Sequence, residues 1–486
     1  MKKVIIIGGG IAGLSAGCYA QMNGFDSEIY EMNNISGGLC TAWKRKDYLF
    51  DGCLHWLVGT SPANPFYRLW EELGALKGKK FFSYEYFNKI IDEDGRLFTA
   101  YVNPYRLREE MLEYSKEDKK LINKIADNMR CLMKIKMPLD FNLLSFFKLL
   151  PLIFIFRKYS MGATEFSSLF KNNILRKFIK HTFDWHDMSV AFILWTMALM
   201  ADGDGQYVLG GALEFARTIE SRYKELGGKI FFNKKVKEII VKNDSAAGIL
   251  LNDDTEVTGD FVISCADGYT TIFEWLKGNY LNNKIRKYYN ELEPFPPLVY
   301  VSLGLNSDYS KAPCRLTLLL KKEIDVGGKK INKLECVNKS FDNILAKEGK
   351  GILHFIASAD YSFWKNLYNN KDKYYETKNK IAEDMITAIS EIYPEIRKHI
   401  EVIDIATPVT FERYTGNWKG SYEGWLLNKE TMSLRLPITL PGLKNFYMAG
   451  HWLSPGGGLP SAALTARNAI RVLCHHNKIK FSTTTI

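Results

Sequence analysis

The chain has 486 residues, of which 46% are hydrophobic and 24% charged, a balance typical of folded proteins and a length too great for one ordinary domain. Its formal net charge of +11 is spread over short lysine-rich segments such as 77–80. Since no nucleic-acid-binding motif accompanies this charge, nucleic acid is excluded as the expected partner, and a solvated face or an anionic membrane surface remains.

The eight cysteines are far apart, without a C-x-x-C pair, and the histidines form no H-E-x-x-H motif. This pattern predicts reduced thiols in a cytoplasmic protein, with no disulfide framework and no metal site. The pair Lys2-Lys3 before an apolar run imitates a signal peptide, but glycines interrupt the run early. We therefore expect the N-terminus to belong to the fold.

The N-terminal residues predict a βαβ unit. A strand is expected over 2–7, a helix over 11–23 and a second strand over 27–30. Glycines fill the turn between the first strand and the helix, and the acid Glu31 follows the second strand. This is the fingerprint of a dinucleotide-binding unit.

The glycines of the turn have separate roles in this prediction. Gly8 permits the tight turn, Gly10 lets a pyrophosphate approach the backbone, and Gly13 lets helix and strand pack closely. The helix N-terminus would offer N–H groups and a positive dipole to the phosphates. Glu31 would accept hydrogen bonds from the adenosine ribose.

A second glycine pair, Gly37-Gly38, follows soon after Glu31. A nicotinamide enzyme does not need this pair. In FAD proteins of the glutathione-reductase and amine-oxidase type it brings a second loop against the cofactor, so the sequence here resembles that superfamily. The stretch YLFDGCLHWLVG over 48–59 continues the resemblance, with Gly52 one position earlier than in the usual F-D-x-G turn.

Two apolar segments follow. The segment 141–156, interrupted by Lys148 and Pro151, is short for a membrane span, which needs about twenty residues. It is expected to form either a buried helix pair or a monotopic patch that dips into a bilayer. The segment 190–205 begins as a nearly all-apolar helix, which suits a long hydrocarbon substrate or an ordinary core.

The C-terminal stretch NFYMAGHWLSPGGGLPSAALTARNAIRVL predicts a strand over 445–449, a glycine loop and a helix over 460–473. It resembles the bacterial phytoene desaturase, carotenoid isomerase and retinol saturase group, which carries a G-x(4)-P-G-G-G-x-x-x-A element. The stretch 407–425 and the central stretch 207–241 resemble the same group, with Gly210-Gly211 before a helix. The positions that fill the C-terminal element here are Gly450, Pro455, Gly456, Gly457, Gly458 and Ala462.

The resemblance implies an α/β fold, with a Rossmann-type, glutathione-reductase-like FAD-binding domain and an interleaved α+β substrate domain. The FAD domain would comprise 1–75, 205–275 and 405–486, and the substrate domain 76–204 and 276–404. The cofactor is expected to be FAD. The residues expected to bind it are Gly8, Gly10, Ile11, Ala12, Gly13, Glu31, Gly37, Gly38, Leu39, Val236, Gly450, Pro455, Gly457, Gly458, Leu459 and Ala462.

The resemblance further implies an FAD-dependent oxidoreductase that desaturates or saturates a carbon–carbon bond of a polyprenoid, carotenoid-like or other apolar lipid. If a double bond is reduced, a proton donor is needed, and His55 or Tyr414 could serve. The expected partners are an apolar small molecule and, through peripheral attachment, a membrane surface. The sequence predicts no oligomeric state.

Three other functions are open at this point. A flavin-dependent cis–trans polyene isomerase would need no net redox change. An amine oxidase is less favoured, because the loop 450–458 holds no cysteine that could tether flavin. A prenyl-group binding protein of the GDP-dissociation-inhibitor type shares the fold without redox chemistry, but here the glycines of a cofactor site are intact.

Overall fold

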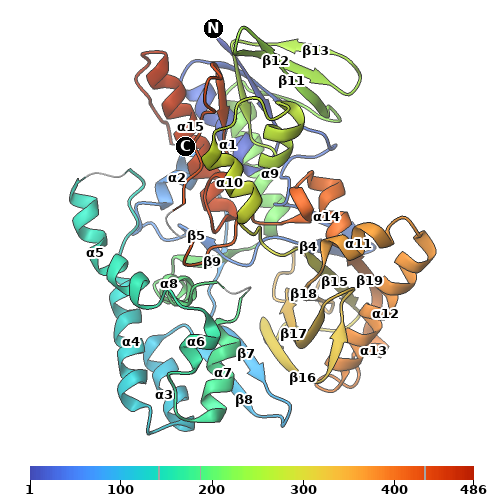
Figure 1. Ribbon diagram of the computed structural model, residues 1–486. Coiled ribbons are helices and arrows are strands. Elements are labelled where there is room, and N and C mark those ends of the chain that lie inside the picture. Colours follow the sequence, from blue (N-terminus) through green and yellow to red (C-terminus); the bar gives the residue numbers. More distant parts are fainter. Residues whose placement is uncertain (141–142, 186–187, 432–433, 486) are drawn as a thin grey trace.

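The computed structural model describes the chain apart from residues 141–142, 186–187, 432–433 and 486 (Figure 1). It comprises a parallel sheet covered by helices, a group of helices between residues 104 and 201, and a seven-stranded mixed sheet. In Figure 1 the parallel sheet lies at the top, the helical group at the lower left and most of the seven-stranded sheet at the lower right.

The parallel sheet draws its strands from distant parts of the chain. They are β1 (Lys3–Ile7), β2 (Asp26–Tyr30), β10 (Lys229–Phe231), β14 (Phe261–Ser264) and β20 (Phe446–Met448). Their order is β10-β2-β1-β14-β20, and all neighbours are parallel. Residues 4–7 of the central strand are at most 3% exposed, because such a sheet is covered on both faces.

Three helices pack together on this sheet (Figure 1). They are α1 (Ile11–Met22), α9 (Gly211–Glu225) and α15 (Gly458–His476). Helix α1 contacts both of the others, and its small residues permit this: a Cβ on Gly17 would lie 2.6 Å from the Tyr223 ring of α9. An antiparallel sheet stands beside this layer, formed by β11 (Val236–Lys242), β12 (Ser245–Leu251) and β13 (Glu256–Thr258).

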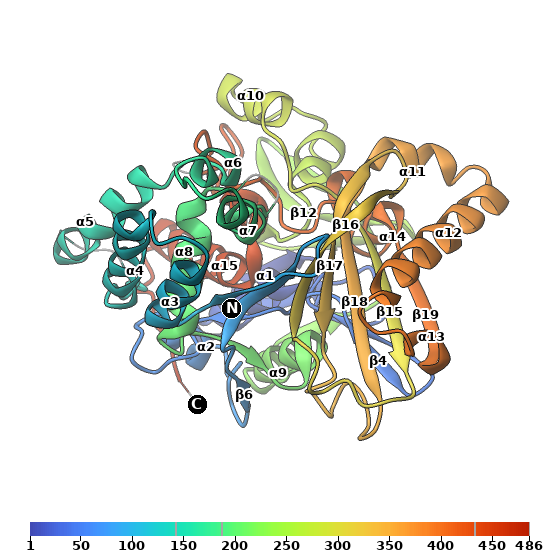
Figure 2. The same cartoon turned by 90° about the horizontal axis from the view of Figure 1, so that it is seen from below.

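The second large sheet has seven strands. They are β7 (Tyr86–Ile91), β8 (Leu97–Tyr101), β15 (Leu298–Leu305), β16 (Arg315–Asp325), β17 (Lys330–Asn338), β18 (Gly351–Ser358) and β19 (Ile400–Ala406). Their order is β19-β15-β18-β17-β16-β7-β8, antiparallel except where β7 pairs with β16. Helix α12 (Lys371–Ser390) lies along this sheet and contacts β16 and β19 (Figure 2), and this face has its own apolar core.

The helical group includes the most apolar helix of the chain's central part. Its members are α3 (Pro104–Tyr114), α4 (Lys119–Met133), α5 (Leu143–Lys158), α6 (Ala163–Ser167), α7 (Asn173–Phe183) and α8 (Val190–Ala201). Nine residues of α8 are buried, so it is apolar all round because it is surrounded by protein.

The segment 141–156 was expected to form a buried helix pair or a membrane-dipping patch. From Leu143 onward the structure shows one helix, α5, with Pro151 inside it rather than between two helices. Phe147, Ile153 and Phe154 are between 47% and 69% exposed. Among the helices that the structure describes, none is long and apolar enough to cross a membrane.

Short elements connect these layers. They are β3 (Ala42–Arg45), β4 (Tyr48–Asp51), β5 (Leu57–Val58), α2 (Tyr67–Glu72), β6 (Phe81–Phe82), β9 (Gly205–Val208), η1 (Thr270–Trp275), α10 (Asn283–Glu291), α11 (Tyr361–Leu367), α13 (Ile396–His399), α14 (Pro408–Thr415), η2 (Trp418–Gly420) and η3 (His451–Leu453).

The predicted α/β class with a Rossmann-type parallel sheet is confirmed. The N-terminal elements lie within one residue of their expected bounds, and α15 begins two residues earlier and ends three later than expected. The expected division into 1–75, 205–275 and 405–486 against 76–204 and 276–404 stays a prediction.

The close packing of α1 on β1 gives a stability prediction. A Cβ on Gly13 would lie 1.8 Å from the carbonyl oxygen of Gly8, so Gly13→Ala must push the helix away from the strand. We expect the substitution to lower the free energy of unfolding by about 3 kcal/mol, measured by urea denaturation.

The control is Gly162→Ala. A Cβ there meets open space, and its φ of −78° suits any residue, so the free energy of unfolding should stay within about 0.5 kcal/mol of the parent value. Equal stability of the two variants would contradict the packing argument.

Candidate functional site

A cavity of about 1050 Å³ opens at the carboxyl ends of the parallel strands. The residues that directly follow β1, β2 and β14 line it, namely Gly8, Glu31 and Cys265, and so does Gly450, two residues after the end of β20. This is where ligands bind in open α/β sheets. Its volume lies just above the roughly 300–1,000 Å³ usual for ligand cavities, so it has room for more than one small molecule.

The predicted glycine residues form one wall of this cavity. The Gly37 N–H donates to the Gly9 carbonyl at 2.8 Å, which brings the second glycine loop against the first turn. A Cβ on Gly37 would lie 2.4 Å from the Cys40 carbonyl oxygen, so a side chain would not fit there. Helix α1 begins after Gly10 without a side-chain cap, which leaves its first N–H groups to serve an anion.

Glu31 is held beside this wall. Its Oε2 accepts from the Gly9 N–H at 2.6 Å, and its Oε1 accepts from the backbone and side-chain nitrogens of Asn33 at 2.8 and 2.9 Å. The Asn33 amide also donates to the carbonyl of Tyr414 at 2.9 Å. The second strand and the end of α14 therefore meet at this end of the cavity.

The C-terminal element forms a facing wall. Gly450, Gly457 and Gly458 have φ values of 122°, 46° and 77°, and all line the cavity. Here too the helix, α15, begins without a side-chain cap. The Gly450 N–H donates to Thr465 Oγ1 at 2.9 Å, which anchors the loop to α15.

Every residue expected to bind the cofactor lines this single cavity, with the exception of Gly13. Gly13 lies behind the wall, where α1 meets β1. The lining members are Gly8, Gly10, Ile11, Ala12, Glu31, Gly37, Gly38, Leu39, Val236, Gly450, Pro455, Gly457, Gly458, Leu459 and Ala462.

The two proton-donor candidates are placed apart. Tyr414 is 55% exposed at the Glu31 end of the cavity, with the Arg413 guanidinium 4.7 Å from its ring centroid. The His55 side chain lies deep in the cavity, with Nδ1 buried and without a hydrogen-bond partner in the described parts of the chain. Burial and the nearby charges of Lys339 and Arg315 lower the pKa of His55 well below its usual range, so the ring is neutral.

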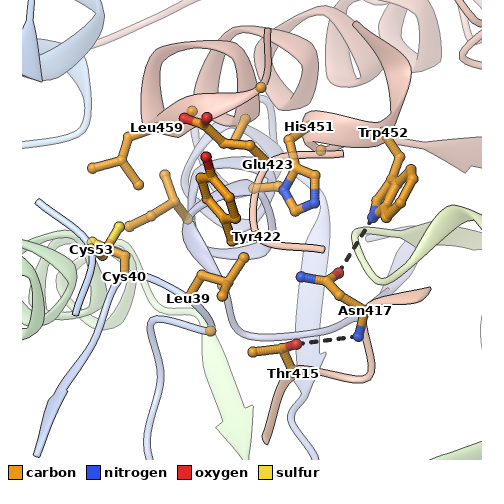
Figure 3. Close-up of a pocket in the computed structure, with 18 of the residues that line it drawn as sticks. Leu39, Cys40, Cys53, Thr415, Asn417, Tyr422, Glu423, His451, Trp452 and Leu459 are labelled. Carbon is orange, nitrogen blue, oxygen red and sulfur yellow. Dashed lines mark hydrogen bonds between the residues drawn. The ribbon is translucent and has the colours of Figure 1, made fainter. Parts of the chain in front are cut away.

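The sequence prediction missed Glu423. Figure 3 shows it beside Tyr422 and near Leu459 in the cavity. Its Oε1 lies 3.5 Å from the position a Cβ on Gly458 would occupy, at the start of α15. Burial raises the pKa of Glu423 to about 8, so the group is a protonated carboxylic acid at neutral pH.

His451 shares this part of the cavity (Figure 3). A Cβ on Gly424 would lie 2.9 Å from the His451 ring, so the loop that carries Glu423 packs directly against it. Burial lowers the pKa of His451 to about 4, and its buried Nε2 has no partner among the residues that the structure describes. A neutral ring nitrogen is therefore free to bond a ligand.

Beyond the glycine walls the cavity becomes an apolar chamber. Trp56 and Trp185 meet edge to face at 5.2 Å, and Phe156 of α5 meets Trp195 of α8 at 5.9 Å. The apolar side chains that line the chamber are Trp56, Met137, Phe156, Trp185, Met188, Phe192, Trp195, Leu298, Val337, Ile356 and Leu427.

One cation stands within this chamber. Arg315, the first residue of β16, lies with its guanidinium carbon 5.2 Å from the Trp56 ring centroid and 4.6 Å from that of Phe87. The sequence analysis did not single it out. A charged residue directly before the leucine-rich run 316–320 was the signal that could have drawn attention to it.

The features of the cavity fit a dinucleotide cofactor, because its walls offer both N–H donors and a partly polar surface for a ring. The N-termini of α1 and α15 face the cavity and have no side-chain caps. Its glycine wall leaves no room for a Cβ at Gly37. The Nε2 of His451 has no bond to the described residues and also faces the cavity. In the described ranges no cluster of side chains could hold a metal ion.

Comparison with known proteins agrees with this geometry. The model of the flavin containing amine oxidoreductase family matches residues 11–473. The chain is 24% identical over 281 residues to a prolycopene isomerase of Daucus carota, covering 56% of this chain and 44% of that protein. It is 24% identical over 503 residues to a 4,4'-diapophytoene desaturase (4,4'-diapolycopene-forming) of Methylomonas sp., covering 99% and 96%.

Among solved structures, an oxidoreductase from Methanosarcina mazei superimposes with a TM-score of 0.60 at 17% identity, covering 96% of this chain and all of that one. This likeness supports the fold. The chain spans less than half the length of the plant isomerases it matches.

The family match covers nearly the whole chain, from α1 into α15. It confirms the expected resemblance to the amine oxidase superfamily and the expected flavin cofactor, FAD. This chain belongs to the flavin-containing amine oxidoreductase family.

Proposed function

We propose that this protein is an FAD-dependent oxidoreductase that acts on a carbon–carbon bond of a long, apolar, polyene-type lipid. The observation that carries the proposal is that one cavity contains both the glycine walls at the strand ends and the aromatic chamber beyond them. An apolar chamber of this kind suits a substrate with few polar atoms.

The names of the relatives support this substrate class. The Methylomonas protein, matched over 99% of this chain, is a diapophytoene desaturase, and the carrot protein is a prolycopene isomerase. Both names refer to carotenoid-type polyenes. The chamber offers such a chain aromatic and methionine side chains along much of its surface.

The bound flavin would supply hydride transfer, and the protein's own residues would do the rest. Gly10, Glu31 and the start of α1 would hold the nucleotide half, while the loop from Gly450 and the start of α15 would hold the ring half. The Trp56 and Trp195 side chains would exclude water from the reacting carbons.

Glu423 would provide the proton. When a double bond is saturated, one carbon receives a hydride and its neighbour receives a proton, and Glu423 is protonated at neutral pH. His55 is neutral and lies deeper in the cavity, so we assign it no acid role. The same acid could protonate a polyene reversibly, and this observation keeps a cis–trans isomerase as the second candidate.

The charge of the chamber opposes an amine substrate. Arg315 stands in it, and the buried Lys339 is near enough to His55 to depress the pKa of that ring. A protonated amine would be repelled by these cations.

For a prenyl-binding protein without redox chemistry, in contrast, the intact glycine walls would have no function.

We also propose a peripheral contact with a membrane surface. Helix α5 links the cavity to the exterior, because Phe156 lines the chamber while Ile153 and Phe154 are 47% and 69% exposed. Arg157 and Lys158 in the last turn would face anionic lipid headgroups. A lipid substrate could then enter along α5.

The proposed reaction is tested anaerobically. We expect the reduced, FAD-loaded enzyme to be reoxidised by at least one of retinol, lycopene and phytoene, with a product two hydrogen atoms heavier, followed by flavin absorbance and mass spectrometry. An isomerised product with the flavin still reduced would favour the second candidate. No response with reduced or oxidised enzyme would reject the polyene class and favour amines, and a colourless protein that cannot be loaded with FAD would favour the binding protein.

The role of Glu423 is tested by Glu423→Gln. The amide keeps the shape but donates no proton, so the single-turnover rate of polyene reduction should fall by roughly 10²–10⁴-fold. In the parent enzyme the rate should fall as pH rises through about 8, because the acid ionises there, and this limb should vanish in the variant.

The control for this test is Glu430→Gln, which alters an exposed acid on the same segment and should leave the rate unchanged. An unchanged pH profile in Glu423→Gln would reject the proton-donor role.

The membrane contact is tested by Ile153→Glu. We expect it to weaken binding to vesicles containing phosphatidylglycerol by roughly tenfold, measured by co-sedimentation, because a carboxylate replaces an apolar anchor. Ile344→Glu, at a 63% exposed position in another region, is the matched control and should bind as the parent does. Equal loss in both variants would reject α5 as the contact.

A further inference from the structure

Within the described part of the chain, the guanidinium of Arg315 has no hydrogen-bond or ion-pair partner. Its Nη1 is buried without a hydrogen bond, and its contacts in the described structure are with the faces of Trp56 and Phe87. Arginine stays protonated in proteins, so this half-buried side chain carries a positive charge whose Nη1 is shielded from solvent. Shielding such a charge from water costs free energy unless a carboxylate of the protein or a ligand pairs with it.

Glu335, a carboxylate close enough to act on the charge of Arg315, already pairs with another cation. Glu335 Oε1 lies 3.0 Å from Lys333 Nζ, and the same lysine lies 3.2 Å from Asp184. Glu335 belongs to β17, the strand that pairs with β16. The charge of Arg315 is therefore left to face the chamber.

Two further groups near Arg315 bear on the chemistry of its ligand. The His55 ring lies 6.2 Å from the Trp56 ring between centroids and close enough to Arg315 to feel its charge, and its Nδ1 has no partner among the described residues. Lys339 lies 3.6 Å from Asp51 and is 1% exposed, so its charge is offset locally. No carboxylate from the described residues bonds Arg315, and a neutral imidazole N–H beside it would add a second donor.

We propose that Arg315 binds the carboxylate of an amphiphilic substrate, so that the lipid acted on is a long-chain polyene acid rather than a pure hydrocarbon. This inference rests on the proposed function and names its substrate class. The planar guanidinium would take the carboxylate, and the His55 Nδ1–H would donate beside it. The chain would lie along the aromatic side chains of α8 and α5.

This arrangement fixes the direction of the substrate. A carboxylate at Arg315 anchors one end at β16, while the chain extends through the chamber that the glycine walls and Glu423 also line. The distance from the carboxylate to the reacting bond would then be set by the protein. A pure hydrocarbon would leave the charge of Arg315 unpaired.

The test uses retinoic acid and retinol, which share a polyene chain and differ in their end group. Binding to the FAD-loaded full-length protein is followed by quenching of tryptophan fluorescence. We expect the acid to bind at least about tenfold more tightly than the alcohol, because a charged hydrogen bond is gained. Arg315→Gln should lose this preference, and Arg315→Lys should lose part of it because the fork geometry is gone.

Arg397→Gln, which removes a 44% exposed arginine of the same chain, should keep the full preference. Should Arg315→Gln fail to load FAD, Arg315→Lys and a comparison of the acid with methyl retinoate on the parent protein carry the test. Equal affinity for acid, ester and alcohol, or a preference that survives in the Arg315 variants, would overturn the carboxylate site and leave the proposed function standing. Failure of all three retinoids to bind would overturn both.

Discussion

The approach of α1 to β1 is the constraint on which the rest of this structure depends. Only a glycine at position 13 allows the helix to start directly above the end of the central strand. That start fixes where the uncapped N–H groups of α1 point, and the second glycine loop is hydrogen-bonded against the same turn. One packing contact thus places the nucleotide wall of the cavity, and the other walls are built around it.

The cavity divides its polar groups by position. The end near Glu31 is rich in backbone donors and acceptors and stays partly open, as the exposure of Tyr414 shows. In the inner part, burial favours the uncharged forms of the ionisable groups, so that His55 and His451 are neutral and Glu423 is protonated. Burial, more than charge pairing, sets these states, so they depend on the aromatic side chains that exclude water.

The sequence was informative where function needs a local pattern. Glycines at positions 8, 10 and 13 with Glu31 lie close together along the chain, so spacing alone predicted their elements to within one residue. Glu423 and Arg315 belong to no such pattern. They come to the cavity from different segments, and their importance follows from burial, which a single sequence does not display. For α5 the sequence left burial and an exposed apolar patch open, because an apolar run does not say which side neighbours cover.

The strand order of the parallel sheet affects how the protein folds during its synthesis. β20 pairs with β14, and α15 packs on α1, so the last tenth of the chain closes a layer that its first residues open. Synthesis proceeds from the N-terminus, and contacts of such long sequence separation form late. On the ribosome the cavity therefore stays incomplete until residues 446–476 have been synthesised and have packed against the N-terminal βαβ unit. Cofactor capture is thereby coupled to the synthesis and folding of β20 and α15.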